Sequence, residues 1–512
     1  MKPPWWKSAV VYQIYPRSFA DASGDGVGDL RGVRERLDHL AWLGVDALWL
    51  SPIYPSPMAD FGYDVADYCD VHPLFGSLAE FDALVAAAHA RGIRVLLDFV
   101  GAHTSSEHPW FRESRASRTS PKRGWYVWRD ARPDGALPNN WRAAFLDLPA
   151  WTLDERTGQY YLHSFLPEQP DLDWSNPEVV GAMHGALRFW LDRGVDGFRA
   201  DVIHNIGKDP ALPDVPPERE RLAHHILNED PRTHELLRGI RRLLDSYPGD
   251  RMMVGEVVAL STAGVASFYG RSDELQLAFN FLPLLSPWEA ERWRRSVESV
   301  AREFEAVDAW PTWVLSNHDQ KRHRTRYGSE ARARAAAVLL LGLRGTPFLY
   351  QGEELGLEDA VIQEQRRVDP GNRDGCRAPI PWDAKPLHGW PADPWLPFPP
   401  DAEQRNVESL RADPTSILHL YRRLLHARRA SPALSVGEQT LLPAPEGVLA
   451  WRREAEGDVR VVAVNFMGEE RAMALGGGLL VEVASDGAAE GAPFSGRLAP
   501  DQAVVLRPNR DA

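Results

Sequence analysis

Short apolar runs alternate with amphipathic stretches along most of the chain. Runs of this kind, bounded by glycine and polar residues, are typical of buried strands. Eight of them are found at residues 10–15, 47–50, 95–98, 197–201, 252–257, 275–282, 312–316 and 347–350. Strands that alternate with helices predict a parallel (β/α)8 barrel. A doubly wound open sheet is the alternative, although no glycine fingerprint of a nucleotide-binding fold follows the first strand.

The stretches between these runs carry helix signals. Residues 33–40 place their apolar side chains on one helical face. Ser77 and Glu80 have the spacing of a capping box. Asn176 can cap a third helix, and Pro177 can occupy its first position. Each of these helices is followed by a glycine, which suits the left-handed conformation that closes a last turn.

Two regions interrupt the alternation and predict further domains. Residues 104–173 lack helical periodicity and are too many for an ordinary loop, so they predict a subdomain inserted after the third strand. From Ser431 onward the helical pattern stops, and residues 431–512 predict an antiparallel β-sandwich. The barrel itself is expected at residues 1–103 and 174–430. Within it, the proline-rich stretch 369–400 reads as a long loop over the barrel mouth.

Charge and composition narrow the partners. Lys and Arg total 58 against 72 Asp and Glu, a net charge of −14 that repels phosphate backbones and disfavours nucleic acid. Two cysteines, Cys69 and Cys376, do not make a disulfide framework. No signal peptide and no long apolar segment is evident, so we expect a cytoplasmic protein without a membrane partner. Both a monomer and a homo-oligomer remain open.

Ionisable side chains collect where the predicted strands end. Because carboxyl ends of barrel strands meet on one face, these groups are expected to converge. They are Asp98 and His103, Arg199 and Asp201, Glu256, and His318 with Asp319.

A cluster of carboxylates fits either a divalent metal site or glycoside cleavage. Cleavage needs one ionised and one protonated carboxyl group, and the residue types fit it better. Arg199, two residues before Asp201, favours the ionised form of that carboxylate. Apolar neighbours such as Val254 and Val257 are expected to raise the pKa of Glu256, as a general acid requires.

The motifs around these residues resemble the α-amylase superfamily, glycoside hydrolase family thirteen, and within it the oligo-1,6-glucosidase and α-glucosidase group. Several motifs in matching order carry the resemblance over nearly the whole chain. They are Trp5-Trp6-Lys7, residues 12–19 (Tyr-Gln-Ile-Tyr-Pro-Arg-Ser-Phe), Phe61-Gly62-Tyr63-Asp64, residues 197–201 (Gly-Phe-Arg-Ala-Asp), Gly255-Glu256, Asn317-His318-Asp319-Gln320 and Tyr350-Gln351-Gly352-Glu353-Glu354.

The resemblance implies roles for the matching positions. Asp201 is implied to be the nucleophile, Glu256 the acid/base, and Asp319 the carboxylate that holds the 2- and 3-hydroxyls of the substrate. Asp60 and Arg377 are implied to cap the far end of a terminal glucose, which gives a pocket and exo action. The other residues implied to bind the α-glucoside substrate are Tyr63, Asp98, His103, Phe145, Gln169, Arg199, Val202 and His318.

A loop near the N-terminus has oxygen-bearing residues at alternate positions, as a hard cation requires. In the family a similar loop binds calcium or magnesium, so the resemblance implies a structural ion here and no cofactor for catalysis. The ligands are expected at Asp21, Ser23, Asp25, Val27 and Asp29.

Linkage and acceptor preference depend on finer features. In the family, valine after the nucleophile, as at Val202, goes with α-1,6 bonds. Two departures stand near the site: Gly101-Ala102 precedes His103 where the family has Asn, and residues 145–148 replace Phe-Gly-Gly. They favour transfer of glucose to another acceptor as well as to water. The alternatives are an α-glucosyltransferase or isomerase such as trehalose synthase, and a non-catalytic barrel that serves as an interaction module.

Overall fold

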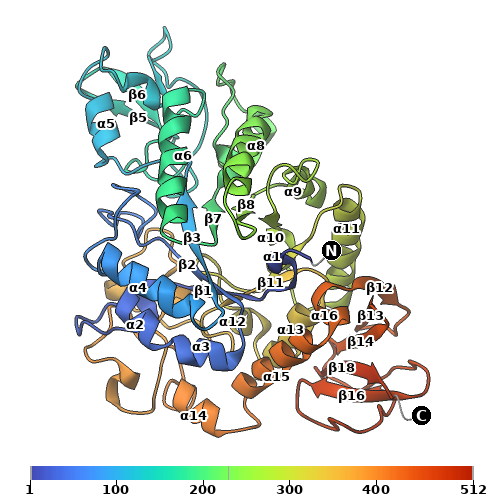
Figure 1. Ribbon diagram of the computed structural model, residues 1–512. Coiled ribbons are helices and arrows are strands. Elements are labelled where there is room, and N and C mark those ends of the chain that lie inside the picture. Colours follow the sequence, from blue (N-terminus) through green and yellow to red (C-terminus); the bar gives the residue numbers. More distant parts are fainter. Residues whose placement is uncertain (1–2, 229, 510–512) are drawn as a thin grey trace.

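The computed structural model describes residues 3–228 and 230–509 and is built around an eight-stranded parallel sheet (Figure 1). A hydrogen bond of 2.8 Å from the Thr312 hydroxyl to the Ala278 carbonyl joins the first and last strands of the sheet order. The sheet is thus a nearly closed barrel, and the predicted (β/α)8 fold is confirmed. In sheet order the strands are β10 (Thr312–Val314), β11 (Thr346–Tyr350), β1 (Val11–Ile14), β2 (Ala47–Leu50), β3 (Arg94–Val100), β7 (Gly197–Asp201), β8 (Met252–Glu256) and β9 (Leu277–Phe279).

Several strands are shorter than the apolar runs predict. The run 275–282 yields only β9, because the Asn280 side chain accepts a hydrogen bond from the Leu282 amide and caps a one-turn helix, α10 (Phe281–Leu284). The run 312–316 ends at Val314, and the Ser316 hydroxyl accepts a hydrogen bond from the His323 amide. Strand pairing ends where polar side chains form hydrogen bonds with backbone amides of the segment that follows the strand.

The predicted helix signals work as local caps. The Ser77 side chain accepts from the Glu80 amide, and Asn176 accepts from the Glu178 amide. The first predicted helix is interrupted at Arg36, whose guanidinium lies 4.3 Å from the ring of Trp382, and it divides into α2 (Leu30–Glu35) and α3. The helices that alternate with the barrel strands are α3 (Leu37–Leu43), α4 (Leu78–His89), α6 (Pro177–Asp192), α8 (Arg232–Asp245), α9 (Thr262–Ser267), α11 (Ala290–Glu305), α13 (Glu330–Gly342) and α15 (Ile417–Ala430).

The segment between β3 and β7 rises above the barrel in Figure 1. Before α6 it contains one short α-helix, α5 (Pro109–Ser114), and a three-stranded antiparallel sheet. The sheet order is β4 (Trp128–Arg129), β6 (Gln159–Leu162) and β5 (Trp151–Asp154). Trp141, Trp151 and Leu162 form a separate small core beneath it.

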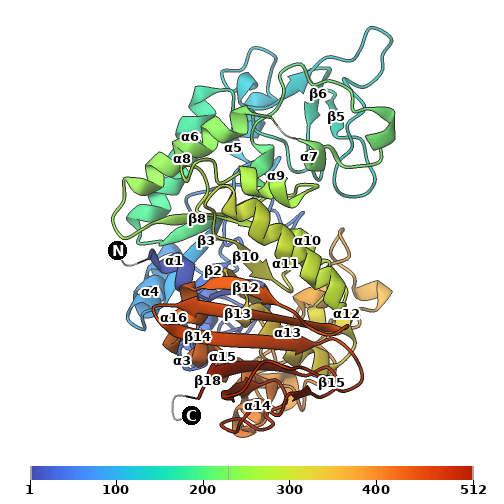
Figure 2. The same ribbon diagram turned by 90° about the vertical axis from the view of Figure 1, so that its right-hand side faces the viewer.

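The C-terminal segment forms antiparallel sheets, although a helix comes first. Ser431 caps α16 (Pro432–Val436), so the expectation that helices stop at this residue is wrong by one element. A two-stranded sheet of β15 (Arg471–Ala472, labelled in Figure 2) and β17 (Arg497–Leu498) accompanies the main one. The five-stranded sheet runs in the order β12 (Glu438–Leu442), β13 (Val448–Ala455), β14 (Asp458–Asn465), β18 (Ala503–Pro508) and β16 (Leu479–Ala484).

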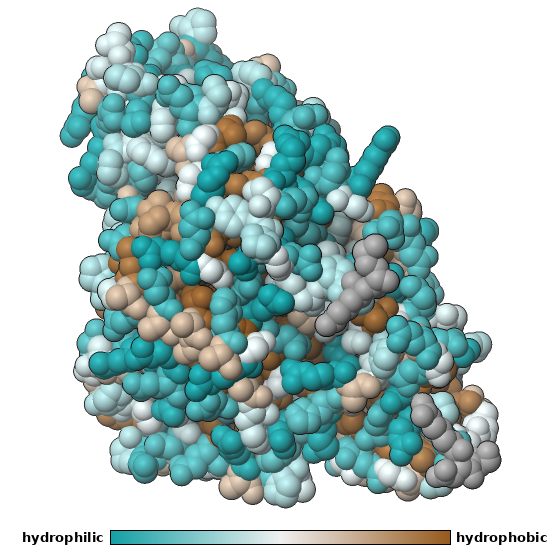
Figure 3. Space-filling view, viewed as in Figure 1, coloured by the Kyte–Doolittle hydropathy of each residue, from teal (hydrophilic) through white to brown (hydrophobic). Residues whose placement is uncertain are grey.

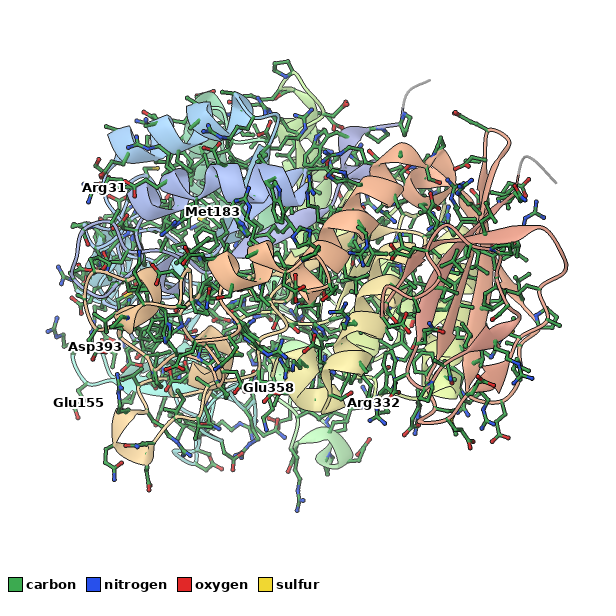
Figure 4. All side chains as sticks on the ribbon, turned by 90° about the horizontal axis from the view of Figure 1, so that it is seen from below. Arg31, Glu155, Met183, Arg332, Glu358 and Asp393 are labelled. Atoms are coloured by element: carbon green, nitrogen blue, oxygen red, sulfur yellow. The ribbon has the colours of Figure 1, made fainter. Side chains whose placement is uncertain are left out.

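This sheet packs closely on the last barrel helices. The indole N–H of Trp451 and the guanidinium of Arg453 both donate to the Gly342 carbonyl at the end of α13, at 3.0 and 2.8 Å. A Cβ at Gly342 would lie 3.1 Å from Val462, so glycine permits the close approach. Arg332, at the other end of α13 (Figure 4), reaches Asp501 across the same boundary. The barrel and the C-terminal sheet therefore share a well-packed interface.

Among residues 3–228 and 230–509, no helix combines the length and apolarity that a bilayer crossing needs. The face in Figure 3 is mainly hydrophilic, with apolar side chains gathered in patches.

Candidate active site

Three carboxyl groups surround one arginine at the carboxyl ends of β3, β7 and β8. The strand register places Asp98 opposite Arg199, and the alternation of a strand puts Arg199 and Asp201 on the same face. Arg199 Nη1 donates to Asp98 Oδ1 at 2.7 Å and to Asp201 Oδ1 at 2.8 Å. Its Nη2 donates to the Glu256 carboxylate. Carboxyl groups that the sequence places at the ends of different strands therefore all contact the buried guanidinium of Arg199.

Burial raises the pKa of all three carboxyls, against the attraction of the Arg199 charge. The pKa rises to about 6 for Asp98, about 7 for Asp201 and about 8 for Glu256. The negative charges of the group oppose one another, since Asp98 raises the pKa of Asp201 and Asp201 raises that of Glu256. One guanidinium cannot balance three carboxylates, so the cluster holds at least one proton near neutral pH.

Asp319 has a different environment. Burial works against its ionised form, but His318, Arg373 and Arg377 outweigh that effect and lower its pKa. Burial also lowers the pKa of His318 itself to about 3, so the lasting positive charge comes from the two arginines. Asp319 Oδ1 accepts from Arg373 Nη1 at 3.0 Å and from Arg377 Nη2 at 3.1 Å. This carboxylate is therefore ionised at neutral pH.

A cavity of about 360 Å³ opens above this cluster. Its volume suits one or two sugar rings rather than a long chain. Nine of the residues that the sequence nominated line it, namely Asp60, Tyr63, His103, Phe145, Gln169, Asp201, Val202, Glu256 and Asp319.

Four other residues of the predicted site are buried behind the cavity lining and do not form its wall. They are Asp98, Arg199, His318 and Arg377, and all are fully buried. The Tyr63 hydroxyl donates to Asp98 Oδ2 at 3.2 Å and also contacts His318 Nε2, so it links the floor to the wall.

The Asp60 carboxylate contacts Arg373 and Gln169. Arg373 Nη2 donates to Asp60 Oδ1 at 2.5 Å, while Arg377 donates instead to Asp319 and Asp369. Gln169 Nε2 holds the other Asp60 oxygen at 3.1 Å. Arg373 thus joins Asp60 to Asp319 across one end of the cavity, and Arg377, which is expected to cap the same glucose, contacts Asp319 and not Asp60. The segment carries both arginines without a helical or strand period, so the sequence could not tell which one reaches inward.

Val202 holds a strained backbone beside the catalytic candidates. Its φ of 34° and ψ of 41° lie in the left-handed region, which a β-branched residue rarely adopts. In this conformation its amide donates to Glu256 Oε2 at 3.3 Å. The strain therefore accompanies a contact that orients Glu256, which is where backbone strain is usually found in enzymes.

His103, which directly follows the departure at Gly101-Ala102, has one ring nitrogen without a hydrogen-bond partner among the described residues. His103 Nε2 lies 3.0 Å from the Tyr63 carbonyl and 3.1 Å from Gln169 Nε2. Its Nδ1 has no hydrogen-bond partner among the described residues. Ala102 is completely buried, and a Cβ at Gly101 would lie 2.7 Å from the Phe99 ring. The backbone at Gly101 has room only for glycine unless Phe99 moves.

Several residues of the cavity wall were not predicted from the sequence. The ring of Phe165 lies 5.7 Å from that of Phe145 and 5.2 Å from that of His225 between centroids, tilted by 48° and 40°. Gln320 belongs to the motif Asn317-His318-Asp319-Gln320, whereas Phe165 lies in an irregular segment and His225 in the one-turn helix α7 (His224–Leu227), which is too short to give a periodic signal. The unpredicted lining residues are Ala144, Phe165, His225, Val258, Gln320, Gly371 and Arg373.

In the loop that is expected to bind a cation, the carboxylate oxygens accept hydrogen bonds from nearby backbone amides. Asp29 accepts from the amides of Ala22, Ser23 and Gly32, and the last of these bonds caps α2. Asp21 accepts from Gly24 and Gly26 at 2.7 and 2.9 Å. In the described chain, no group of three His, Cys, Asp or Glu side chains is arranged to hold a metal ion. Hydrogen bonds between these carboxylates and nearby backbone amides therefore define the shape of the loop.

Comparisons with known proteins show the family to which the chain belongs. Residues 13–437 match the family model of the α-amylase catalytic domain. A probable α-glucosidase of Rhizobium meliloti (strain 1021) is 43% identical over 506 residues, covering 91% of this chain and 90% of its own. An oligo-1,6-glucosidase of Parageobacillus thermoglucosidasius is 36% identical, with 91% of each chain covered. The crystal structure of an α-glucosyl transfer enzyme superposes with a TM-score of 0.92 at 40% identity, over 99% of this chain and 100% of that one. The chain belongs to the α-amylase family of glycoside hydrolases.

Proposed function

We propose that this glycoside hydrolase is a retaining, exo-acting α-glucosidase that removes a terminal α-linked glucose from disaccharides or short oligosaccharides. The observation that carries the proposal is the buried guanidinium of Arg199 in contact with both Asp201 and Glu256 at the floor of one small cavity. Two carboxyls in one cleft, with different affinities for a proton, are what glycoside cleavage requires.

The proposed reaction proceeds in two steps. A carboxylate oxygen of Asp201 attacks C1 of the glucose, the bond from C1 to the leaving oxygen breaks, and Glu256 gives its proton to that oxygen. Water then attacks C1 as Glu256 takes up one of its protons, and the ester bond to Asp201 breaks. The proton and both carboxyl groups return to their starting states, with the configuration at C1 retained.

The order of the pKa values supports this division of roles. The pKa of Glu256 rises to about 8 and that of Asp201 to about 7, so Glu256 keeps a proton after Asp201 has lost its own. The amide of Val202 also faces Glu256, and Arg199 contacts both groups. Asp319, held ionised by two arginines, is assigned to the 2- and 3-hydroxyls of the bound glucose.

Exo action is supported by the closed end of the cavity. Arg373 connects Asp60 with Asp319, and Gln169 supports Asp60 from the side. A longer chain would have to pass through these charged contacts, whereas a terminal glucose meets them with its hydroxyls. We therefore assign Arg373 to the wall that recognises the non-reducing end.

Linkage preference is assigned from Val202, which lines the cavity next to the nucleophile. By its resemblance to the oligo-1,6-glucosidases, a valine here indicates α-1,6 bonds and short isomalto-oligosaccharides. Sucrose, trehalose and maltose are the competing substrates. The similarity to a glucosyl transfer enzyme favours transglucosylation alongside hydrolysis, and an isomerase such as a trehalose synthase is the second candidate. A purely structural barrel is disfavoured by the intact acids.

We further propose a cytoplasmic location, supported by the two cysteines, Cys69 and Cys376, which are both free. A structural Ca²⁺ or Mg²⁺ in the loop 21–29 stays a prediction of the family resemblance. Its binding would require the carboxylates of Asp21 and Asp29 to share their oxygens with the amides that they now accept from.

A substrate panel tests the reaction. Incubation with isomaltose, maltose, sucrose and trehalose should release α-glucose first, and kcat/KM should be highest for isomaltose. Asp201→Asn should lose nearly all turnover, because an amide cannot form the glucosyl ester. Nuclear magnetic resonance of the first-formed anomer measures retention. Release of β-glucose would refute the two-step reaction, and a new disaccharide from maltose or sucrose without net glucose would favour the isomerase.

The pH profile tests the division of roles. Asp201 acts ionised, so kcat/KM should rise as pH increases through about 7, and Glu256 acts protonated, so it should fall above about 8. In Glu256→Gln, an aryl α-glucoside with a good leaving group should retain kcat/KM, which reports the transfer of glucose to Asp201, and should lose the alkaline limb, while kcat falls because the second step has no base. A persisting alkaline limb in that variant would assign the limb to another group.

Arg373→Lys tests the pocket wall. A lysine cannot bridge Asp60 and Asp319 as a guanidinium does, so kcat/KM should fall about tenfold or more, mainly through KM. Arg366→Lys, an exposed change in the same loop, is the matched control and should behave as the parent enzyme. An unchanged KM in Arg373→Lys would remove this residue from donor recognition.

Thermal unfolding tests the predicted ion. If the loop binds Ca²⁺, adding it in excess to chelator-treated protein should raise Tm by about 2 °C or more, since a ligand of the native state stabilises it. Asp21→Ala should abolish the rise, and Asp134→Ala in another exposed loop should preserve it. Equal melting with and without Ca²⁺ would leave the loop as an ordinary hydrogen-bonded turn.

A further inference from the structure

A second cleft lies on the flank of the barrel, apart from the catalytic cavity. It has a volume of about 430 Å³ and is lined by residues from α2, α3, α14 (Val407–Ala412) and the segment 382–385, which is enough room for a small metabolite. The three helices lie close together in the lower part of Figure 1. Among the described residues, none lines both this cleft and the catalytic cavity. We call it the flank cleft.

Two arginines of the flank cleft lack an anionic partner. The guanidinium of Arg36 lies 4.3 Å from the centre of the Trp382 ring, and that of Arg411 lies 4.3 Å from the Trp42 ring. Within residues 3–228 and 230–509, neither guanidinium forms an ion pair or a hydrogen bond. Stacking on a tryptophan face holds a guanidinium in place and leaves its N–H edge available to an oxyanion.

The acidic residues of the flank cleft do not supply this partner. Three of the four acidic side chains in its lining each face another cation: Asp38 with Arg91 at 2.7 Å, Asp383 with Lys385 at 3.6 Å and Glu35 with Arg31 at 4.0 Å. The fourth, Glu408, has no side-chain partner among the described residues. Two guanidinium groups therefore remain against one carboxylate, and the cleft is locally positive in a chain whose net charge is −14.

His39, which also lines the flank cleft, is a buried donor without a partner. It is only 6% exposed and lies 6.0 Å from the Trp42 ring and 5.6 Å from the Trp382 ring, between centroids. Burial, together with the charges of Arg411 and Arg36, lowers its pKa to about 3, so the ring is neutral and has one N–H. Neither ring nitrogen has a hydrogen-bond partner among the described residues. An acceptor in the cleft would remove the cost of this buried, unpaired N–H.

These groups together favour a dianion that also carries hydroxyls. A phosphate monoester has a charge of about −1.5 to −2 at neutral pH and three strong acceptor oxygens. It can therefore neutralise Arg36 and Arg411 together and still accept from His39, whereas a single carboxylate can neutralise only one arginine. The carboxylate of Glu408 would repel a phosphate but can accept hydrogen bonds from hydroxyl groups.

We propose that the flank cleft binds a phosphorylated sugar. The phosphate lies between the guanidinium groups of Arg36 and Arg411 and accepts from the N–H of His39, while a sugar hydroxyl donates to Glu408. The site shares no group with the catalytic carboxyls, so this inference does not depend on the proposed glucosidase reaction. It adds a ligand that the reaction itself does not use.

Calorimetric titration with fructose 6-phosphate tests the site, because this ketose phosphate has no glucosyl group for the catalytic cavity. We expect one site per chain with a Kd below about 1 mM. Inorganic phosphate lacks the hydroxyls and should bind about tenfold more weakly, since the hydrogen bond to the charged Glu408 is lost. Excess fructose should not displace the ligand. Absence of binding, equal affinity for inorganic phosphate, or displacement by fructose would overturn the proposal.

Single substitutions locate the ligand in the flank cleft. Arg36→Gln and Arg411→Gln should each raise the Kd about tenfold or more, because each removes one charged hydrogen-bonding partner of the phosphate. Arg411 is exposed, so its variant should keep the parent Tm and decides the matter if Arg36→Gln disturbs the fold. Arg34→Gln is the matched control and should keep the parent Kd, since it removes the same charge from the last turn of α2 but does not line the cleft.

Other results with these variants contradict the assignment. An unchanged Kd in Arg411→Gln would remove the phosphate from the flank cleft. Equal weakening in Arg34→Gln would show a general effect of charge without a site. Weakening in Arg373→Lys but not in Arg411→Gln would place the ligand in the catalytic cavity, which Arg373 lines. Normal glucosidase activity in a chain that binds no sugar phosphate would contradict only the flank cleft.

Discussion

The buried guanidinium of Arg199 is the interaction on which the site depends. It lies between the carboxyls of Asp98, Asp201 and Glu256, all removed from water, and the strand register holds it there. Unpaired buried carboxylates would be strongly destabilising, but one cation cannot neutralise three of them. The cluster therefore retains a proton near neutral pH, and a retained proton beside an ionised carboxylate is the state that glycoside cleavage uses.

The barrel supplies this cluster, and the irregular segments complete it. Asp60 and Gln169 come from loops outside the barrel strands, and Arg373 comes from the proline-rich stretch before α14 (Val407–Ala412). Long loops without regular structure commonly carry function when a rigid scaffold holds their ends. Here they place a charged bridge of Asp60, Arg373 and Asp319 at one end of the cavity.

Local physical chemistry made much of the fold predictable. Buried strands read as apolar runs, and caps such as Ser77 and Asn176 act within their own turn, so eight strands and several helix starts followed from the chain alone. Strand ends were less predictable, because β9 ends through a cap at Asn280 that competes with sheet pairing. The helix α16 after Ser431 was missed for a related reason: it is a single short element fixed by one cap against neighbouring structure.

For the site, the sequence by itself determined which acids stand at strand ends and that they share one face, because strand direction and alternation are local properties. Only the tertiary structure decided that Arg373, and not Arg377, meets Asp60, since both lie in a segment whose path is set by distant contacts. The strained φ of Val202 and the exposure of Leu146 were likewise decided by packing around the cavity. Periodicity encodes what a residue does within its own element, while the walls of a pocket are made by elements that meet only after the chain has folded.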